Sequence, residues 1–171
     1  MYLDASSILS SSQAVTVTAA STGTYDTAGV GYGNAVTNRI GTATVFGEDV
    51  GGGGPLTSAP QLGVWVTTAF TAGGAGTLQV QLQAGVDNGS NAVTTWDTIV
   101  ESDTYALASL ILSTPQRPLI SFTVPTRYPG QGFPRFYRLN YVVATGPMTA
   151  GAVSAALLTG IDDVPFYPPN F

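Results

Sequence analysis

The segment TLQVQLQA, residues 77–84, constrains the fold of this chain more than any other, because its apolar and polar residues alternate without exception. In an extended strand, neighbouring side chains point to opposite faces, so Leu78, Val80, Leu82 and Ala84 share one face and three glutamines share the other. A helix brings together residues three or four positions apart and cannot separate these two sets. We therefore predict a half-buried antiparallel strand here.

The same alternation returns elsewhere in the chain. It predicts the buried faces of two more strands: Ile120, Phe122 and Val124 in RPLISFTV, and Tyr137, Leu139, Tyr141 and Val143 in FYRLNYVVA, the latter opposite Arg138 and Asn140. The segments LGVWVTTAF and GAVSAALL, and AVTVTA near the start, follow the pattern less strictly. Val and Thr are β-branched and favour extended backbone, so these segments are also predicted to be strands.

Turn-forming residues separate the predicted strands: Gly73-Gly74, Asp87-Asn88-Gly89, Pro115, Pro129-Gly130, Gly146-Pro147 and Gly160. About eight or nine strands at a spacing of roughly ten residues are typical of an all-β sandwich or barrel. We predict a two-sheet antiparallel sandwich, with a jelly roll as the first choice and an immunoglobulin-like sandwich as the second. The segment Tyr105 to Leu112 fits a helix or a strand equally well.

Two arms flank the predicted sandwich domain, which spans residues 14–163 and includes a Gly-rich loop at residues 47–60. The N-terminal arm is residues 1–13, and the C-terminal arm is residues 164–171, VPFYPPNF. Its three prolines favour an extended segment outside the sheets, and its aromatic rings are costly to leave in water. We expect the arms to dock on their own domain or on a neighbour. The candidate contacts to a neighbouring chain or to another copy are their apolar side chains: Tyr2, Leu3, Ile8, Leu9, Phe166, Tyr167 and Phe171.

Charged residues make up only 9% of the chain, and the net charge is −5. Clustered Lys and Arg bind nucleic acids, so this balance argues against a nucleic-acid partner. One group of three arginines, Arg127, Arg135 and Arg138, is interleaved with aromatic residues; we interpret it as a structural cluster around a loop. The chain has no apolar run long enough for a membrane-spanning helix and no signal-peptide pattern at its start, so we expect a cytoplasmic origin and no membrane partner.

The chain has no histidine, cysteine or lysine, which excludes the Ser-His-Asp and Cys-His arrangements and the usual ligands of zinc. Gly51 to Gly54 cannot form a phosphate-binding P-loop without its lysine. Glu101 and Asp103 would share a face of a strand at a Cα separation of about 7 Å, which a glycosidase could use, but solvated acids at a strand end explain them better. The DNGSN segment at Asp87 lacks the later ligands of a calcium loop. We predict no enzyme activity and no cofactor.

Several segments in a fixed order give the chain its resemblance to a known family: SSQAVTVTAASTGTYD, VWVTTAF, TLQVQLQAGVD, Trp96, YALASL and RFYRLNYVVATGPMTAGAVSAALLTGID. Together they resemble the jelly-roll cement (decoration) proteins of tailed-phage heads, the Bordetella podovirus type among them. The resemblance implies a virion protein on the outer surface of the head that forms a homo-oligomer, dimer or trimer, and bridges neighbouring major capsid subunits. The Gly-rich loop and the C-terminal arm do not match this pattern.

A second hypothesis is a carbohydrate-binding module or tail adhesin on a similar sandwich, in which Trp65 and Trp96 would stack on sugars. Against it, Trp65 lies between Val64 and Val66 in a predicted strand, where we expect a core position.

Overall fold

The structure is a computed structural model that describes residues 8–26, 61–90, 92–114, 117–124, 134 and 136–158. Its elements in chain order are β1 (Ile8–Ala14), β2 (Ala19–Ala20), β3 (Tyr25–Asp26), β4 (Gln61–Ala72), β5 (Thr77–Asp87), β6 (Val93–Glu101), β7 (Tyr105–Ala106), the 3₁₀ helix η2 (Leu107–Ser109), β8 (Ile120–Thr123), β9 (Phe136–Ala144) and β10 (Met148–Leu158). Over these residues, no helix has the length and apolar character needed to cross a membrane.

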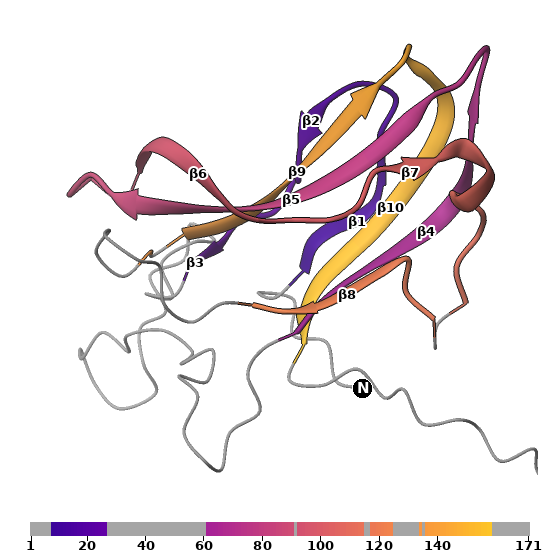
Figure 1. The fold of residues 1–171 in the computed structure, drawn as a ribbon. Helices are drawn as coiled ribbons and strands as arrows, with labels where there is room; N and C mark the ends of the chain where they lie inside the picture. Colours follow the sequence, from indigo (N-terminus) through magenta and orange to yellow (C-terminus); the bar gives the residue numbers. More distant parts are fainter. Residues whose placement is uncertain are drawn as a thin grey trace, which may run out of the picture.

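The described strands form two antiparallel sheets that face each other as a sandwich (Figure 1). One sheet has the order β1-β10-β4-β8, and the other has the order β2-β9-β5-β6, with β3 added to β9 and β7 to β5. The pairs are nested along the chain, because β1 pairs with β10, β2 with β9, β4 with β8, and β5 with β6. Such nesting of strands between two sheets is a jelly roll. The first-choice fold is confirmed, in preference to the immunoglobulin-like sandwich.

The core lies between the sheets and uses the faces predicted from alternation. In the six-stranded sheet, β5 and β9 place Leu78 opposite Val143, Val80 opposite Tyr141 and Leu82 opposite Leu139. All of these side chains are buried or packed against the buried core. In the other sheet, Ile120 on β8 lies opposite Val64 on β4, and both are buried. The strictly alternating segments therefore have the predicted faces inward.

Of the predicted turns, Gly73-Gly74, Asn88-Gly89 and Gly146-Pro147 lie between consecutive strands, whereas Pro115, Pro129-Gly130 and Gly160 lie outside the described residues. The hairpin between β5 and β6 is closed by a hydrogen bond of 2.9 Å from the Asn88 backbone N–H to the Ala92 carbonyl. The segment Tyr105 to Leu112, which fitted a helix or a strand, contains both. Its first two residues form β7, which pairs with β5, and the 3₁₀ helix η2 follows. The chain then buries Leu110 and leaves Ile111 and Leu112 exposed.

The prediction of a strand over AVTVTA, residues 14–19, was wrong for its middle. Residues 16–18 form a bend, because the chain here crosses from the four-stranded sheet to the six-stranded one. The Val15 N–H donates to Gly151 on β10, whereas the Thr18 hydroxyl donates to the carbonyl of Val143 on β9. Val15 is buried and Val17 is 58% exposed, although alternation would place both on one face, because the backbone bends between the sheets.

The assignment of all of residues 1–13 to an N-terminal arm is also corrected. Residues 8–13 belong to β1, which pairs with β10 along the edge of the four-stranded sheet. Leu9 is fully buried in the core. Serines dominate this segment, and their weak strand preference concealed a strand that tertiary pairing stabilises. Residues 1–7, the Gly-rich loop at 47–60 and the C-terminal arm lie outside the described residues.

Candidate functional site

The outer face of β4 carries the first candidate surface. Leu62, Val64 and Val66 point into the core, so Gly63, Trp65 and Thr67 point to the opposite, outer face of the sheet. Trp65 is only partly buried. The predicted core position for Trp65 was therefore wrong: its neighbours in the strand occupy the core, and the indole lies on the surface of the sandwich.

Small residues surround the Trp65 indole on this face. In the pairing of β4 with β10, Ser154 lies opposite Trp65 and Ala156 lies opposite Gly63. A Cβ atom added at Gly63 would lie 2.3 Å from Cη2 of Trp65, so the ring folds back over this glycine. The ring occupies space that larger neighbours would fill, and the small residues beside it leave the sheet surface hollow.

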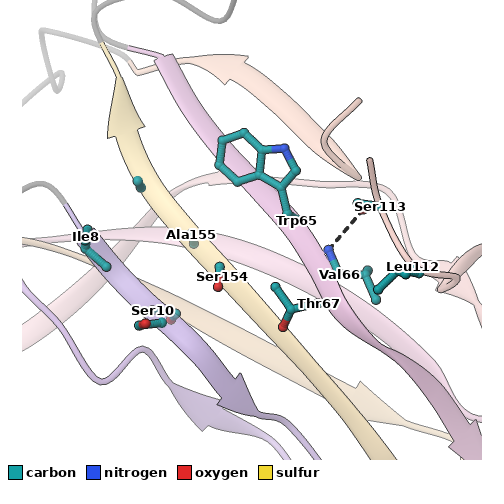
Figure 2. Close-up of a pocket in the computed structure, with 11 residues that line it drawn as sticks. Ile8, Ser10, Trp65, Val66, Thr67, Leu112, Ser113, Ser154 and Ala155 are labelled. Carbon is teal, nitrogen blue, oxygen red and sulfur yellow. Dashed lines mark hydrogen bonds between the residues drawn. The ribbon is translucent and has the colours of Figure 1, made fainter. Parts of the chain in front are cut away.

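This hollow is a groove of about 510 Å³, here called the Trp65 groove. Its lining residues are Ile8, Ser10, Ser11, Trp65, Val66, Thr67, Leu112, Ser113, Ser154, Ala155 and Ala156. Figure 2 shows Ile8 and Ser10 on β1 at one side, Leu112 at the other, and β10 and β4 between them. None of the lining residues is charged. The groove thus offers an apolar surface with hydroxyl groups along it.

A bulge in β1 shapes one wall of the groove. The register between β1 and β10 shifts between Ser10 and Gln13, and Ser12 has a φ of 45°. The backbone N–H of Ser12 donates to Ser154 Oγ at 2.8 Å across the strand pair. The Ser10 hydroxyl donates to Gln13 Oε1 at 2.8 Å and shares a hydrogen bond of 2.7 Å with the Tyr141 hydroxyl. The wall is therefore tied both to β10 and to the other sheet.

Burial raises the pKa of Tyr141 well above its ordinary value, and the hydrogen bond with Ser10 acts in the opposite direction. The phenol is therefore neutral at physiological pH and acts as a structural hydrogen-bonding group.

The opposite wall is held by Ser113. Its backbone N–H donates to the Val66 carbonyl at 2.9 Å, and its hydroxyl accepts from the Val66 N–H at 3.0 Å, the bond drawn in Figure 2. Leu112 precedes Ser113 and stands beside the groove with 63% of its surface exposed. Two hydrogen bonds thus fix the segment that presents an exposed leucine next to Trp65.

The outer face of the six-stranded sheet has a different character, because its polar side chains bond to one another. Gln81 lies between Glu101 and Asn140 in register; its amide N donates to Glu101 Oε1 at 3.1 Å, and its amide O accepts from Asn140 at 2.9 Å. The amide of Gln79 donates to the other Glu101 oxygen at 3.3 Å. This row is a cross-strand network that stabilises the sheet.

A second row on the same face contains Arg138 and Trp96. Arg138 Nε donates to Gln83 Oε1 at 2.8 Å, and its guanidinium carbon lies 4.2 Å from the centre of the Trp96 ring. Burial lowers the pKa of Arg138, but a guanidinium remains charged in proteins. Arg138 is thus used in a cation–π contact within the sheet. Arg138 therefore has the structural role expected of the basic cluster, although it lies within β9 and not around a loop; Arg127 and Arg135 lie outside the described residues.

The carboxylates considered for catalysis do not share a strand face. β6 ends at Glu101, so Asp103 lies beyond the strand, and both side chains are exposed. Glu101 is engaged by two glutamine amides in the row above. Across the described segments, no three acidic, histidine or cysteine side chains are grouped so that they could hold a metal ion.

The candidate contact residues of the two arms lie in different places. Ile8 lines the Trp65 groove, whereas Leu9 is part of the core and cannot reach a partner. Tyr2, Leu3, Phe166, Tyr167 and Phe171 lie outside the described residues. Sequence reasoning missed Trp65 and Leu112 as surface residues. The small residues at 63, 154 and 156 and the adjacent Ile111-Leu112 pair were the signals that could have indicated them.

No curated protein matches this chain. A family model, Bbp16, matches residues 9–157. The match begins in β1 and ends in β10, so it covers both sheets of the sandwich. The chain therefore belongs to the Bbp16 family, the Bordetella phage capsid cement (decoration) protein family.

Proposed function

We propose that this protein binds the outer surface of a bacteriophage head and fastens neighbouring major capsid subunits. The observation that carries the proposal is the family match over residues 9–157, which begins in β1, ends in β10 and so covers both sheets. The members of this family are structural phage proteins. Membership implies that the protein is located in the virion and binds capsid proteins. The proposal further places the protein on the outside of the head, has it bridge neighbouring subunits, and assigns it no catalytic activity.

The chemistry of the chain supports an external position. A net charge of −5 with no lysine is unfavourable next to packaged DNA. Only 9% of the residues are charged, so contact with a partner removes little hydration from charged groups. Contacts repeated over a symmetric shell combine through effective concentration, so weak individual contacts suffice for attachment.

The proposed contacts to the capsid or to another copy are Tyr2, Leu3, Phe166, Tyr167 and Phe171 of the arms, together with Ile8 at the groove. We also propose a homo-oligomer, dimer or trimer, because a head offers two-fold and three-fold positions. Neither nucleic acid nor membrane is expected as a partner.

Quantitative mass spectrometry on purified particles of the phage that encodes this chain tests the proposal. We expect a copy number in a simple ratio to the major capsid protein, and digestion of the protein by protease added to intact heads. A few copies per particle would instead indicate a tail protein. Absence from the particles, or resistance to protease on intact heads, would contradict an external cement.

A variant that lacks residues 164–171 tests the role of the arm in attachment. We expect it to keep the melting temperature of the full chain within a few degrees, because the family match ends before the arm. We expect it to bind heads more weakly, because the aromatic side chains of the arm are proposed contacts. Binding is measured by co-sedimentation with heads stripped of the protein. Unchanged co-sedimentation would remove the arm from the proposed contacts.

The position of Trp65 favours sugar binding as a second candidate function, since an indole on a sheet surface can stack on a sugar ring. Trp96 is a weaker candidate, because Arg138 lies over its ring. Glycan-array binding that is lost in Trp65→Ala and retained in Trp96→Ala would support this function. An array with no bound glycan would reject it.

A further inference from the structure

The Trp65 groove is an uncharged apolar surface on the outside of the sandwich, and Leu112 at its side is 63% exposed. A concave surface of this volume, mostly apolar with a few polar groups, is typical of binding sites. The chemistry that it accepts follows from its lining: an aromatic ring, aliphatic side chains and serine hydroxyls suit an uncharged, extended segment with apolar side chains.

We propose that in the free protein the C-terminal arm, residues 164–171, docks in the Trp65 groove of its own chain. The arm, VPFYPPNF, is uncharged and carries three prolines and three aromatic rings. Segments rich in proline adopt an extended polyproline helix, and grooves lined by aromatic side chains recognise them by packing against the proline rings. Proline cannot donate to a ladder, so the arm docks through its side chains.

The chain geometry allows this docking. β10 forms part of the groove floor through Ser154, Ala155 and Ala156, and it ends at Leu158, two residues beyond Ala156. That separation is about 7 Å along the strand. The seven residues from Leu158 to Pro165 can span up to about 23 Å, enough for the chain to reverse and return over the groove. A tether this short gives an effective concentration of roughly millimolar order, which favours its own groove over a neighbour's.

Docking of the arm is a property of the free protein, before it binds a head, and so goes beyond the proposed attachment. Docking keeps the rings of the arm out of water until a capsid surface competes for them. It is tested in solution without particles, so its failure and a failure of head binding are observed separately.

Trp65 is the reporter for the test. The chain has two tryptophans, so Trp96→Phe leaves Trp65 as the single fluorophore. In this background, the full chain is compared with a variant that carries Phe166→Ser, Tyr167→Ser and Phe171→Ser. We expect the variant to show emission at longer wavelength and a rise of about twofold in acrylamide quenching, since one face of the ring becomes exposed. Adding the peptide VPFYPPNF should reverse both changes.

Adjacent residues provide a matched control on the groove side. Leu112 lines the groove, whereas Ile111 does not, and the two are similarly exposed at 63% and 66%. Leu112→Ser should increase quenching of Trp65 in the full chain, and Ile111→Ser should not. In a Trp65→Phe background, the arm substitutions should leave Trp96 emission unchanged, which excludes unfolding as the cause.

Two outcomes would overturn the proposal. One is equal quenching of Trp65 with and without the aromatic residues of the arm. The other is protection that disappears when the full chain is diluted about a hundredfold, because docking within one chain is independent of concentration and docking on a second copy is not.

Discussion

At the scale of single residues, the hydroxyls of Ser10 and Tyr141 form a polar contact between the sheets. Ser10 lies on β1, Tyr141 lies on β9, and both are buried. We expect Ser10→Ala to lower the free energy of unfolding by about 1–3 kcal/mol, because the Tyr141 hydroxyl would lose this partner in a buried position. Urea unfolding followed by circular dichroism measures the change.

Ser11→Ala is the control for this prediction, since Ser11 is exposed and its removal should change stability by less than about 0.5 kcal/mol. Equal effects of the two substitutions would show that the bond between Ser10 and Tyr141 makes no net contribution.

Gly63 determines where the Trp65 ring lies. An alanine methyl at this position would overlap Cη2 of the ring, so Gly63→Ala should swing the indole away and shift its emission to longer wavelength. The cost in stability should be modest, about 1 kcal/mol, because the ring is at the surface and can move. Gly73→Ala is the control, because an added Cβ there has no atom within 4 Å. Emission that stays the same in Gly63→Ala would contradict the described ring position.

At the scale of elements, β10 holds the four-stranded sheet together, because it pairs with both β1 and β4. Its register with β4 shifts around Gly151, which has a φ of 143°. A Cβ there would lie 2.2 Å from Cδ1 of Phe70 in the core. Gly151→Ala should therefore lower the free energy of unfolding by about 2 kcal/mol or more, through strain and overlap together.

Thermal unfolding of Gly151→Ala and of Gly74→Ala measures this effect, because Gly74 lies in an open turn with no atom near an added Cβ. Comparable melting temperatures for the two variants would mean that the shift in register is not required by the packing of Phe70.

Strand prediction succeeded where one residue set was clearly polar. In TLQVQLQA the glutamines could only face outward, so both the strand and its buried face were correct. In LGVWVTTAF both alternating sets are apolar or small, and periodicity alone does not say which set is buried. The core assignment of Trp65 followed its position between two valines in the strand, whereas the structure buries Leu62, Val64 and Val66 on the other face.

At the scale of the whole molecule, buried tyrosines control the response to alkaline pH. Burial raises the pKa of Tyr137 and Tyr141 above the ordinary value of about 10. Between the unfolded and folded pKa values, the folded protein holds more protons than the unfolded chain, so the free energy of unfolding falls as pH rises. This stability is fully present below pH of about 10 and is lost as pH rises through the folded pKa.

The expected melting temperature is therefore nearly constant between pH of about 6 and 9, where histidine and cysteine would titrate, since the chain has neither. Above pH of about 10 it should fall, and Tyr141→Phe should make the fall shallower. Scanning calorimetry from neutral to alkaline pH measures both curves. Parallel curves for the two proteins would show that ionisation of Tyr141 does not contribute.

The choice of a jelly roll over an immunoglobulin-like sandwich needed the nested pairing of the strands. The sequence alone was sufficient for the all-β class, the buried faces of β5 and β9 and the absence of histidine and cysteine chemistry. Each follows from residue type and from a period of two, which are properties of the chain itself. Only the tertiary structure placed Ile8–Ala14 in a strand and Trp65 beside a groove. These depend on which strands become neighbours: Gly63, Ser154 and Ala156 meet through the pairing of β4 with β10, between residues about ninety positions apart in the chain.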